Sequence, residues 1–354
     1  FEGRTKKWKS LDYVSGWFMK AADYGTQTES AAAFVSTNSI CQGQQVPILW
    51  PLIFETSHEI AFAHTSFKWA NLASHNAGVT VVIVGISNHV GKVRYLFDAE
   101  GNGETVAKKV KKINAYLVAG PDVIVASISH SPNNRAHMLW GNKPTDGGHL
   151  TLSTAERHVI ETADNRARKY IRPYYGAAEY IRGLQRFCIW VEDRDANSVQ
   201  EVKELQKRFS RVRTFRGASR AAATRPAANY PHRFRQIQSV AREHSLILPR
   251  VSSERREYFP VGILDHKYII SDQAFALYDA PIWNMALIAS RIHLVWIATV
   301  CGKLETRIRY SNTLGWNTFP VPTLTAQNKA DLTRCAEEIL LAREHYFPAT
   351  IADM

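Results

Sequence analysis

Arginines dominate the stretch from Lys207 to Arg235, and no acidic residue occurs between Glu204 and Glu243. Guanidinium groups bind phosphates through paired hydrogen bonds, and the interleaved aromatic rings can stack on bases. A solvated helix face usually mixes both signs of charge, so this composition favours contact with nucleic acid. The arginines predicted to contact a phosphate backbone are Arg208, Arg211, Arg213, Arg216, Arg220, Arg225, Arg233 and Arg235.

A second cluster lies in the segment Gly302-Lys-Leu-Glu-Thr-Arg-Ile-Arg-Tyr310. If this segment is a strand, alternation places Glu305, Arg307 and Arg309 on one face. Arginine can bind guanine O6 and N7, and glutamate can accept from cytosine N4, so the three could contact neighbouring base edges. Ion pairs on an exposed sheet explain the same spacing equally well.

Catalytic motifs are scarce in the sequence, which contains no P-loop, H-E-x-x-H or G-x-S-x-G pattern. Phe67 and Trp69 flank Lys68 shortly before the β-branched run 78–85. Such aromatics can stack on a base that has left the double helix, or simply pack in the core.

Composition narrows the class of protein. The 354 residues are 45% hydrophobic and carry a net charge of +12, which suits a globular protein with an anionic partner. The cysteines lack the spacing of zinc sites or disulfide frameworks, so we expect no bound metal. The N-terminus shows no apolar signal sequence, and the apolar stretch 274–300 is interrupted by charges, so we expect a buried helix, no membrane span and a cytoplasmic location.

Hydrophobic periodicity predicts the elements that hold these residues. Residues 11–24 are expected to form a helix, and residues 31–36 a buried parallel strand whose carboxyl end opens on a crevice. Residues 78–85 form the strongest predicted strand. Further along, capping boxes at Ser153 and Ser198 predict two helix starts, and residues 325–347 predict an amphipathic C-terminal helix.

Several motifs, in this order, resemble the MmeI-like adenine-specific DNA methyltransferases of restriction-modification systems. The similarity extends over nearly the whole chain. The matching segments are 11–24, 34–46, Phe67-Lys-Trp69, 81–85, 113–117, 146–148, Val251-Ser-Ser-Glu-Arg-Arg256 and 317–320.

The resemblance implies an α/β fold: the distal half of a doubly wound, Rossmann-like methyltransferase sheet, then a mixed α+β target recognition domain and a C-terminal helical segment. The corresponding ranges are 1–113, 114–322 and 323–354. The implied reaction is transfer of a methyl group from S-adenosylmethionine to N6 of a flipped adenine in duplex DNA.

Individual roles follow from the same resemblance. Phe67 and Trp69 become candidates for stacking on the flipped base, and Thr37 and Asn38 become candidates for cofactor binding. Base recognition is expected from Ser253, Glu254, Arg255, Asp272, Gln273, Glu305, Arg307 and Arg309.

Two motifs of the family, the glycine-rich cofactor loop and the catalytic Asn-Pro-Pro-aromatic motif, do not occur in the sequence. We therefore expect a piece that binds duplex DNA but lacks a complete cofactor pocket and does not methylate alone. Its further partners would be the missing N-terminal methyltransferase and endonuclease regions. The alternatives are a non-catalytic DNA-recognition subunit and a structured RNA-binding protein.

Overall fold

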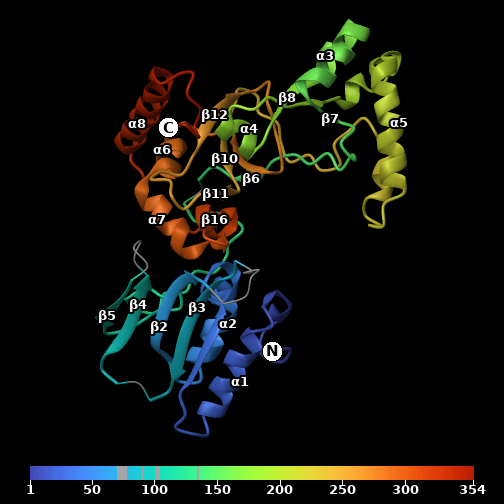
Figure 1. Ribbon diagram of the computed structural model, residues 1–354. Helices are drawn as coiled ribbons and strands as arrows, with labels where there is room; N and C mark the ends of the chain where they lie inside the picture. The colour runs from blue at the N-terminus through green and yellow to red at the C-terminus, as the bar shows by residue number, and fades with distance from the viewer. Residues whose placement is uncertain (70–77, 90, 100–103, 134) are drawn as a thin grey trace. The chain divides into compact units, whose positions relative to one another are not determined.

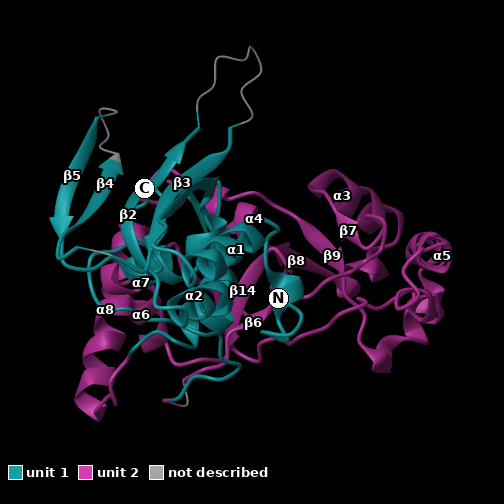
Figure 2. Cartoon of the chain, turned by 90° about the horizontal axis from the view of Figure 1, so that it is seen from below, with its two compact units in different colours: residues 1–132, 251–256, 294–320 teal, residues 133–250, 257–293, 321–354 magenta. Residues whose placement is uncertain are grey.

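The computed structural model describes residues 1–69, 78–89, 91–99, 104–133 and 135–354. It contains two compact units, which Figure 2 distinguishes by colour. Unit 1 comprises residues 1–132, 251–256 and 294–320, and unit 2 comprises residues 133–250, 257–293 and 321–354. The units differ from the three consecutive domains expected from the sequence, because two later segments return to unit 1.

Unit 1 is built on a five-stranded sheet with the order β1-β3-β2-β4-β5 (Figure 1). Its strands are β1 (Ala32–Thr37), β2 (Glu59–Lys68), β3 (Thr80–Ser87), β4 (Arg94–Ala99) and β5 (Thr105–Val110). Strand β3 is antiparallel to both β1 and β2, β2 is parallel to β4, and β4 is antiparallel to β5. The sheet is therefore mixed, as an α/β unit with an inserted antiparallel strand requires.

Strands β1 and β2 run in the same direction, although β3 lies between them. Helix α2 (Val46–Phe54) makes the crossover from β1 to β2, so the carboxyl ends of both strands lie at one edge of the sheet. The expectation of a parallel pairing for 31–36 is wrong among the described residues, because the partner of β1 is the antiparallel β3.

Helices α1 (Ser15–Gly25) and α2 pack on one face of this sheet (Figure 1). Phe18 of α1 and Trp50 of α2 are fully buried, and the Trp50 indole N–H donates to the Ile40 carbonyl at 2.8 Å. Strand β3 is buried along nearly its whole length, as its uninterrupted β-branched run predicts.

A second, three-stranded sheet in unit 1 joins segments distant in sequence. Strand β11 (Val251–Ser252) pairs antiparallel with β16 (Arg307–Arg309), which pairs antiparallel with β15 (Gly302–Leu304). This pairing joins residues 251–256 to residues 294–320, and hydrogen bonds from Lys303 to Gln42 and from Asn317 to Ile128 attach them to the rest of unit 1.

Unit 2 contains two four-stranded sheets, ordered β12-β10-β14-β6 and β13-β8-β9-β7. The first sheet comprises β6 (Leu139–Trp140), β10 (His244–Pro249), β12 (Gly262–Asp265) and β14 (Ala274–Tyr278), and the second comprises β7 (Thr151–Leu152), β8 (Ile171–Tyr175), β9 (Phe187–Ile189) and β13 (Ile269–Ile270). The first is antiparallel throughout, and the second has one parallel pair, β13 with β8.

The helices of unit 2 include α3 (Thr154–Ala163), α4 (Ala177–Arg182), α5 (Lys203–Gly217), α6 (Trp283–Ala289) and α8 (Ala326–His345). The predicted capping box at Ser153 is confirmed, with Glu156 completing it at the start of α3. The one at Ser198 is wrong, because Ser198–Glu201 forms a short 3-10 helix and α5 begins at Lys203. The predicted C-terminal helix is α8.

The apolar stretch 274–300 is not one helix, because it contains β14, α6 and α7 (Arg291–Val300). No single helix in the described part of the chain is long and apolar enough to cross a membrane. Helices α6 and α7 meet the length and composition criteria only as a pair, which is bent by 59°. The mixed α/β class and the helical C-terminal segment agree with the prediction.

Candidate functional site

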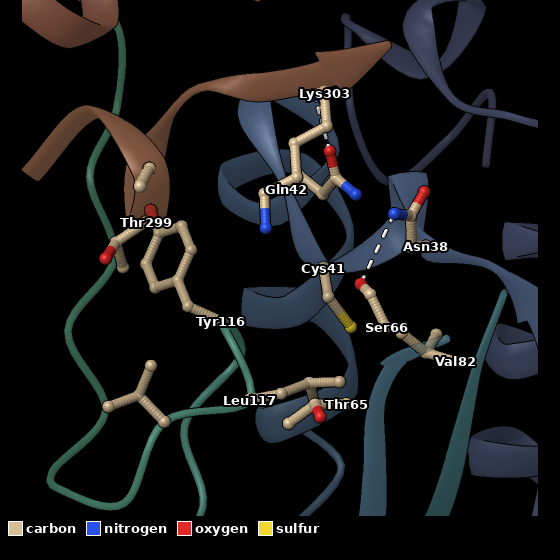
Figure 3. A pocket seen from close by; sticks show the side chains of 12 residues that line it. Asn38, Cys41, Gln42, Thr65, Ser66, Val82, Tyr116, Leu117, Thr299 and Lys303 are labelled. Carbon is tan, nitrogen blue, oxygen red and sulfur yellow. Dashed lines mark hydrogen bonds between the residues drawn. The ribbon is translucent and has the colours of Figure 1, made fainter. Parts of the chain in front are cut away.

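A pocket of about 340 Å³ lies in unit 1 at the carboxyl ends of β1 and β2 (Figure 3). Ligands of open α/β sheets bind outside this end of the strands. The pocket is lined by Asn38, Cys41, Gln42, Thr65, Ser66, Val82, Tyr116, Leu117, Val118, Ala298, Thr299 and Lys303. Its polar groups are amides, hydroxyls and one ammonium, which can hydrogen-bond both a base and an anionic group.

The two residues predicted to bind a cofactor lie in different environments. Asn38 lines the pocket, and its side-chain amide donates to the Ser66 hydroxyl at 3.3 Å. Thr37 is exposed, hydrogen-bonds the Ser39 hydroxyl at 2.9 Å and is not among the lining residues. Only Asn38 is therefore placed to contact a bound molecule here.

Burial sets the chemistry of the pocket's ionisable groups. Desolvation raises the pKa of the Cys41 thiol, which therefore stays protonated and is a poor nucleophile. It also raises the pKa of Tyr116, whose hydroxyl oxygen accepts from the Val125 N–H at 3.0 Å. Both groups stay neutral, so they can give the pocket shape and hydrogen bonds but not a reactive anion.

The candidate base-stacking residues lie at the end of β2. The ring centroids of Phe67 and Trp69 are 6.4 Å apart, and Trp69 is 41% exposed. Phe67 also meets the ring of His64 edge-on, and His64 stacks on Phe97 at 4.3 Å. An aromatic row therefore leads to an exposed indole, as stacking on a base requires, although residues 70–77 lie outside the described residues.

In the β15–β16 hairpin, two of the three residues predicted to share one strand face do so. Arg307 and Arg309 are exposed while Ile308 and Tyr310 are buried, as alternation requires. Glu305, however, lies in the turn with φ of 60°, so strand alternation does not place it. Its carboxylate is 3.1 Å from the Arg307 guanidinium, so an ion pair accounts for part of this spacing.

Residues from the segment after β11 gather at the same turn. Glu254 and Arg255 are exposed, and the Ser253 hydroxyl accepts from the Arg255 N–H at 3.2 Å. The pKa of Glu254 is lowered by a hydrogen bond from its own N–H, and then by the Thr306 hydroxyl and the nearby Arg255 and Arg307. The structure thus brings Ser253, Glu254 and Arg255 together with the hairpin within unit 1.

The other predicted base-contacting pair, Asp272 and Gln273, belongs to unit 2. Asp272 lies 3.8 Å from the Lys143 ammonium, and its backbone carbonyl accepts from Arg250 at 3.0 Å. Arg250 in turn stacks over the Trp140 ring at 4.0 Å. Gln273 is exposed.

Arg216 corrects the prediction for the arginine-rich stretch. It is fully buried, and its guanidinium donates to the carbonyls of Pro144, Thr145, Ala227, Tyr230 and Arg233 at 2.7–3.0 Å. A phosphate cannot reach it, so the predicted backbone contact is wrong. The signal was present in the sequence, because Arg216 continues the buried helical stripe of Leu205, Phe209 and Val212.

The remaining predicted arginines fall into two groups. Arg208 and Arg233 form ion pairs with Glu156 and Asp193 at 2.7 and 3.1 Å, and Arg225 and Arg235 donate to backbone carbonyls. Arg225 is also exposed, and it shares with the exposed Arg211, Arg213 and Arg220 the absence of a carboxylate within 4 Å among the described residues. The free positive charge of this stretch is thus smaller than its composition implies.

Lys303 and Gln42 are the main pocket residues that sequence reasoning did not single out. Gln42 lies in the segment 34–46, which carries the family resemblance, and Lys303 lies in the segment 302–310, which carries the predicted base-contacting residues. Their meeting depends on a contact between distant segments: the Lys303 N–H donates to the Gln42 side-chain carbonyl at 2.6 Å. No local pattern encodes that contact.

The pocket residues do not by themselves fit S-adenosylmethionine. A nucleoside ribose is typically held by a carboxylate, and the lining set contains none. The lining also contains no acidic group to pair with the sulfonium or the amine of the cofactor, and its one charged group is the Lys303 ammonium.

Comparison with known proteins gives consistent matches. Residues 119–323 match the family model for the MmeI target recognition domain, and residues 1–98 match that for the MmeI DNA-methyltransferase domain. DNA methyltransferase A of Bacillus subtilis strain 168 is 36% identical over 97% of this chain and 38% of that protein.

A solved structure of the type IIL restriction-modification enzyme MmeI in complex with DNA matches with a TM-score of 0.92 and 35% identity, over 99% of this chain and 47% of that one. The chain spans less than half the length of either relative.

Proposed function

The chain belongs to the MmeI family, and from this premise we propose that it is part of a site-specific DNA methyltransferase of a restriction-modification system. The proposed reaction transfers a methyl group from S-adenosylmethionine to N6 of an adenine. Because that atom is inaccessible in a stacked duplex, the adenine is flipped out before it reacts. Cytoplasmic DNA is the proposed substrate.

The contribution of this chain to that reaction is sequence-specific binding of duplex DNA. The exposed Arg307 and Arg309 on β16 carry the proposal, because they present two guanidinium forks at adjacent same-face positions of a short strand. Such forks suit guanine edges in a major groove. Arg211, Arg213 and Arg220 supply uncompensated positive charge for the phosphate backbone.

Methyl transfer needs cofactor-binding groups that the pocket residues do not supply. We therefore expect this chain alone to bind DNA without methylating it. Incubation with labelled S-adenosylmethionine and genomic DNA should transfer no label, and clear turnover would contradict this part of the proposal.

The DNA-binding claim is tested by competition. A fluorescent duplex bound to the chain should be displaced by unlabelled duplex DNA at lower concentration than by single strands or RNA of the same sequence. The reverse order would favour an RNA-binding protein that stacks unpaired bases.

A further inference from the structure

Lys303 enters the pocket from strand β15 of the β15–β16 hairpin, and close backbone contacts fix the position of this strand. The Lys303 N–H donates to Gln42 at 2.6 Å. Gly43, at φ of 54°, has the Gly302 backbone 3.3 Å from the position that a Cβ would occupy, so strand β15 lies directly against the segment after β1. In Figure 3 the Lys303 side chain extends from this contact toward Cys41 and Tyr116.

The ammonium of Lys303 has no counter-charge in the pocket. No carboxylate lies within 4 Å of it in the part of the chain that the structure describes, and the other lining residues are neutral. Burial lowers its pKa, against a weaker opposing effect of Glu254. A partly buried ammonium without a carboxylate partner gains more from an anionic ligand than a fully exposed lysine would.

The position of Lys303 in the β15–β16 hairpin indicates what kind of anion would bind it. Lys303 pairs with Ile308 across the two strands, and Arg307 and Arg309 flank Ile308 on the exposed face. DNA contacts that hold Arg307 and Arg309 would therefore hold the backbone from which Lys303 extends. The amides and hydroxyls of Asn38, Ser66 and Thr299 remain for the uncharged part of the ligand.

We propose that Lys303 binds the backbone phosphate of the nucleotide that leaves the duplex and enters this pocket, and so acts as a positioning residue. The inference rests on the proposed function. It adds a specific link between recognition and reaction, because one hairpin carries both the base-contacting arginines and the group that holds the displaced nucleotide.

Phosphate neutralisation tests the link. In a duplex that the chain selects from random sequences, each phosphate around the target adenine is replaced in turn by a neutral methylphosphonate. For the unmodified chain, replacement at one position beside the adenine should weaken binding about tenfold. In Lys303→Gln that replacement should have no further effect, whereas Lys303→Arg should restore the sensitivity.

Lys109→Gln is the matched control, because Lys109 is exposed on β5 of the same unit and should leave the whole profile unchanged. Identical profiles for Lys303→Gln and the unmodified chain would overturn the inference while leaving DNA binding intact. If the unmodified chain does not bind duplex DNA at all, the proposed function is overturned, and this inference with it.

A second measurement uses only the unmodified chain, in case the variants do not fold. An acylating reagent modifies the neutral form of a lysine, and the lowered pKa of Lys303 increases the fraction in that form. The selected duplex should protect Lys303 from acylation, and the duplex with the critical methylphosphonate should protect it less. Equal protection by both duplexes would contradict a phosphate contact.

Discussion

The arginine-rich stretch of unit 2 and the β15–β16 hairpin of unit 1 look alike in sequence but use their arginines differently. On α5, Arg213 is exposed while Arg216, three residues later, is buried and holds five backbone carbonyls. On β16, Arg307 and Arg309 are both exposed, on either side of the buried Ile308. Charge in the sequence therefore does not show which arginines are free to bind a ligand; that depends on the face of the element on which each one lies.

The two regions also differ in how their arginines are neutralised. Arg307 has the local carboxylate of Glu305 at 3.1 Å, whereas Arg309 has no carboxylate within 4 Å among the residues described. An arginine paired with its neighbour must exchange that partner when DNA binds, at a cost that offsets part of the new contact. Arg309 carries no such cost.

The largest expected effect distinguishes folding from binding within α5. Arg216→Met leaves several buried carbonyls without a donor, so the free energy of unfolding should fall by about 3 kcal/mol or more. Arg213→Met, on the exposed face, should change it by less than about 0.5 kcal/mol. Urea denaturation of both variants measures this difference, and equal losses would remove the distinction.

Base recognition should produce the next effect. Arg309→Ala should weaken binding to the selected duplex by about 1–3 kcal/mol and leave random duplexes nearly unchanged. Arg307→Ala should cost less than Arg309→Ala, because it also removes the pairing with Glu305 that DNA must displace. Fluorescence anisotropy on both duplexes measures the losses, and equal losses on the two duplexes would reassign these arginines to phosphate contact.

Some features of both regions can be predicted from local sequence. The central strand β3, helix α1 and the capped helix α3 follow from periodicity and capping, which are local properties of the chain. The exposure of Arg307 and Arg309 follows from the period of two in a strand. The burial of Arg216 follows from its place on the helical stripe of Leu205, Phe209 and Val212, a signal that its charge opposes.

The remaining features depend on contacts between distant segments. The pocket requires Lys303 to meet Gln42, and the turn at Glu305 requires a hairpin to form where an uninterrupted strand was expected. The partners of Arg216 come from residues on both sides of α5 in sequence. Such contacts are set by tertiary packing, which no window of a single sequence specifies.

The smallest expected effect concerns the exposed arginines of α5. Arg213→Ala should lower affinity for every duplex by a similar factor and reduce the slope of log K against log salt by about one unit. Titrations at several salt concentrations give that slope. Since Arg216 contacts only carbonyls, a folded Arg216→Lys variant should keep the original slope, and an altered slope would place it at the interface after all.

Selection from a random duplex library tests the central claim most directly, because the claim is that this chain recognises a specific DNA sequence. The account predicts enrichment of one short motif by the unmodified chain, and relaxed preference at one or two positions of that motif by Arg309→Ala. Binding that enriches no motif, or that prefers single strands or RNA over duplex DNA, would contradict the account.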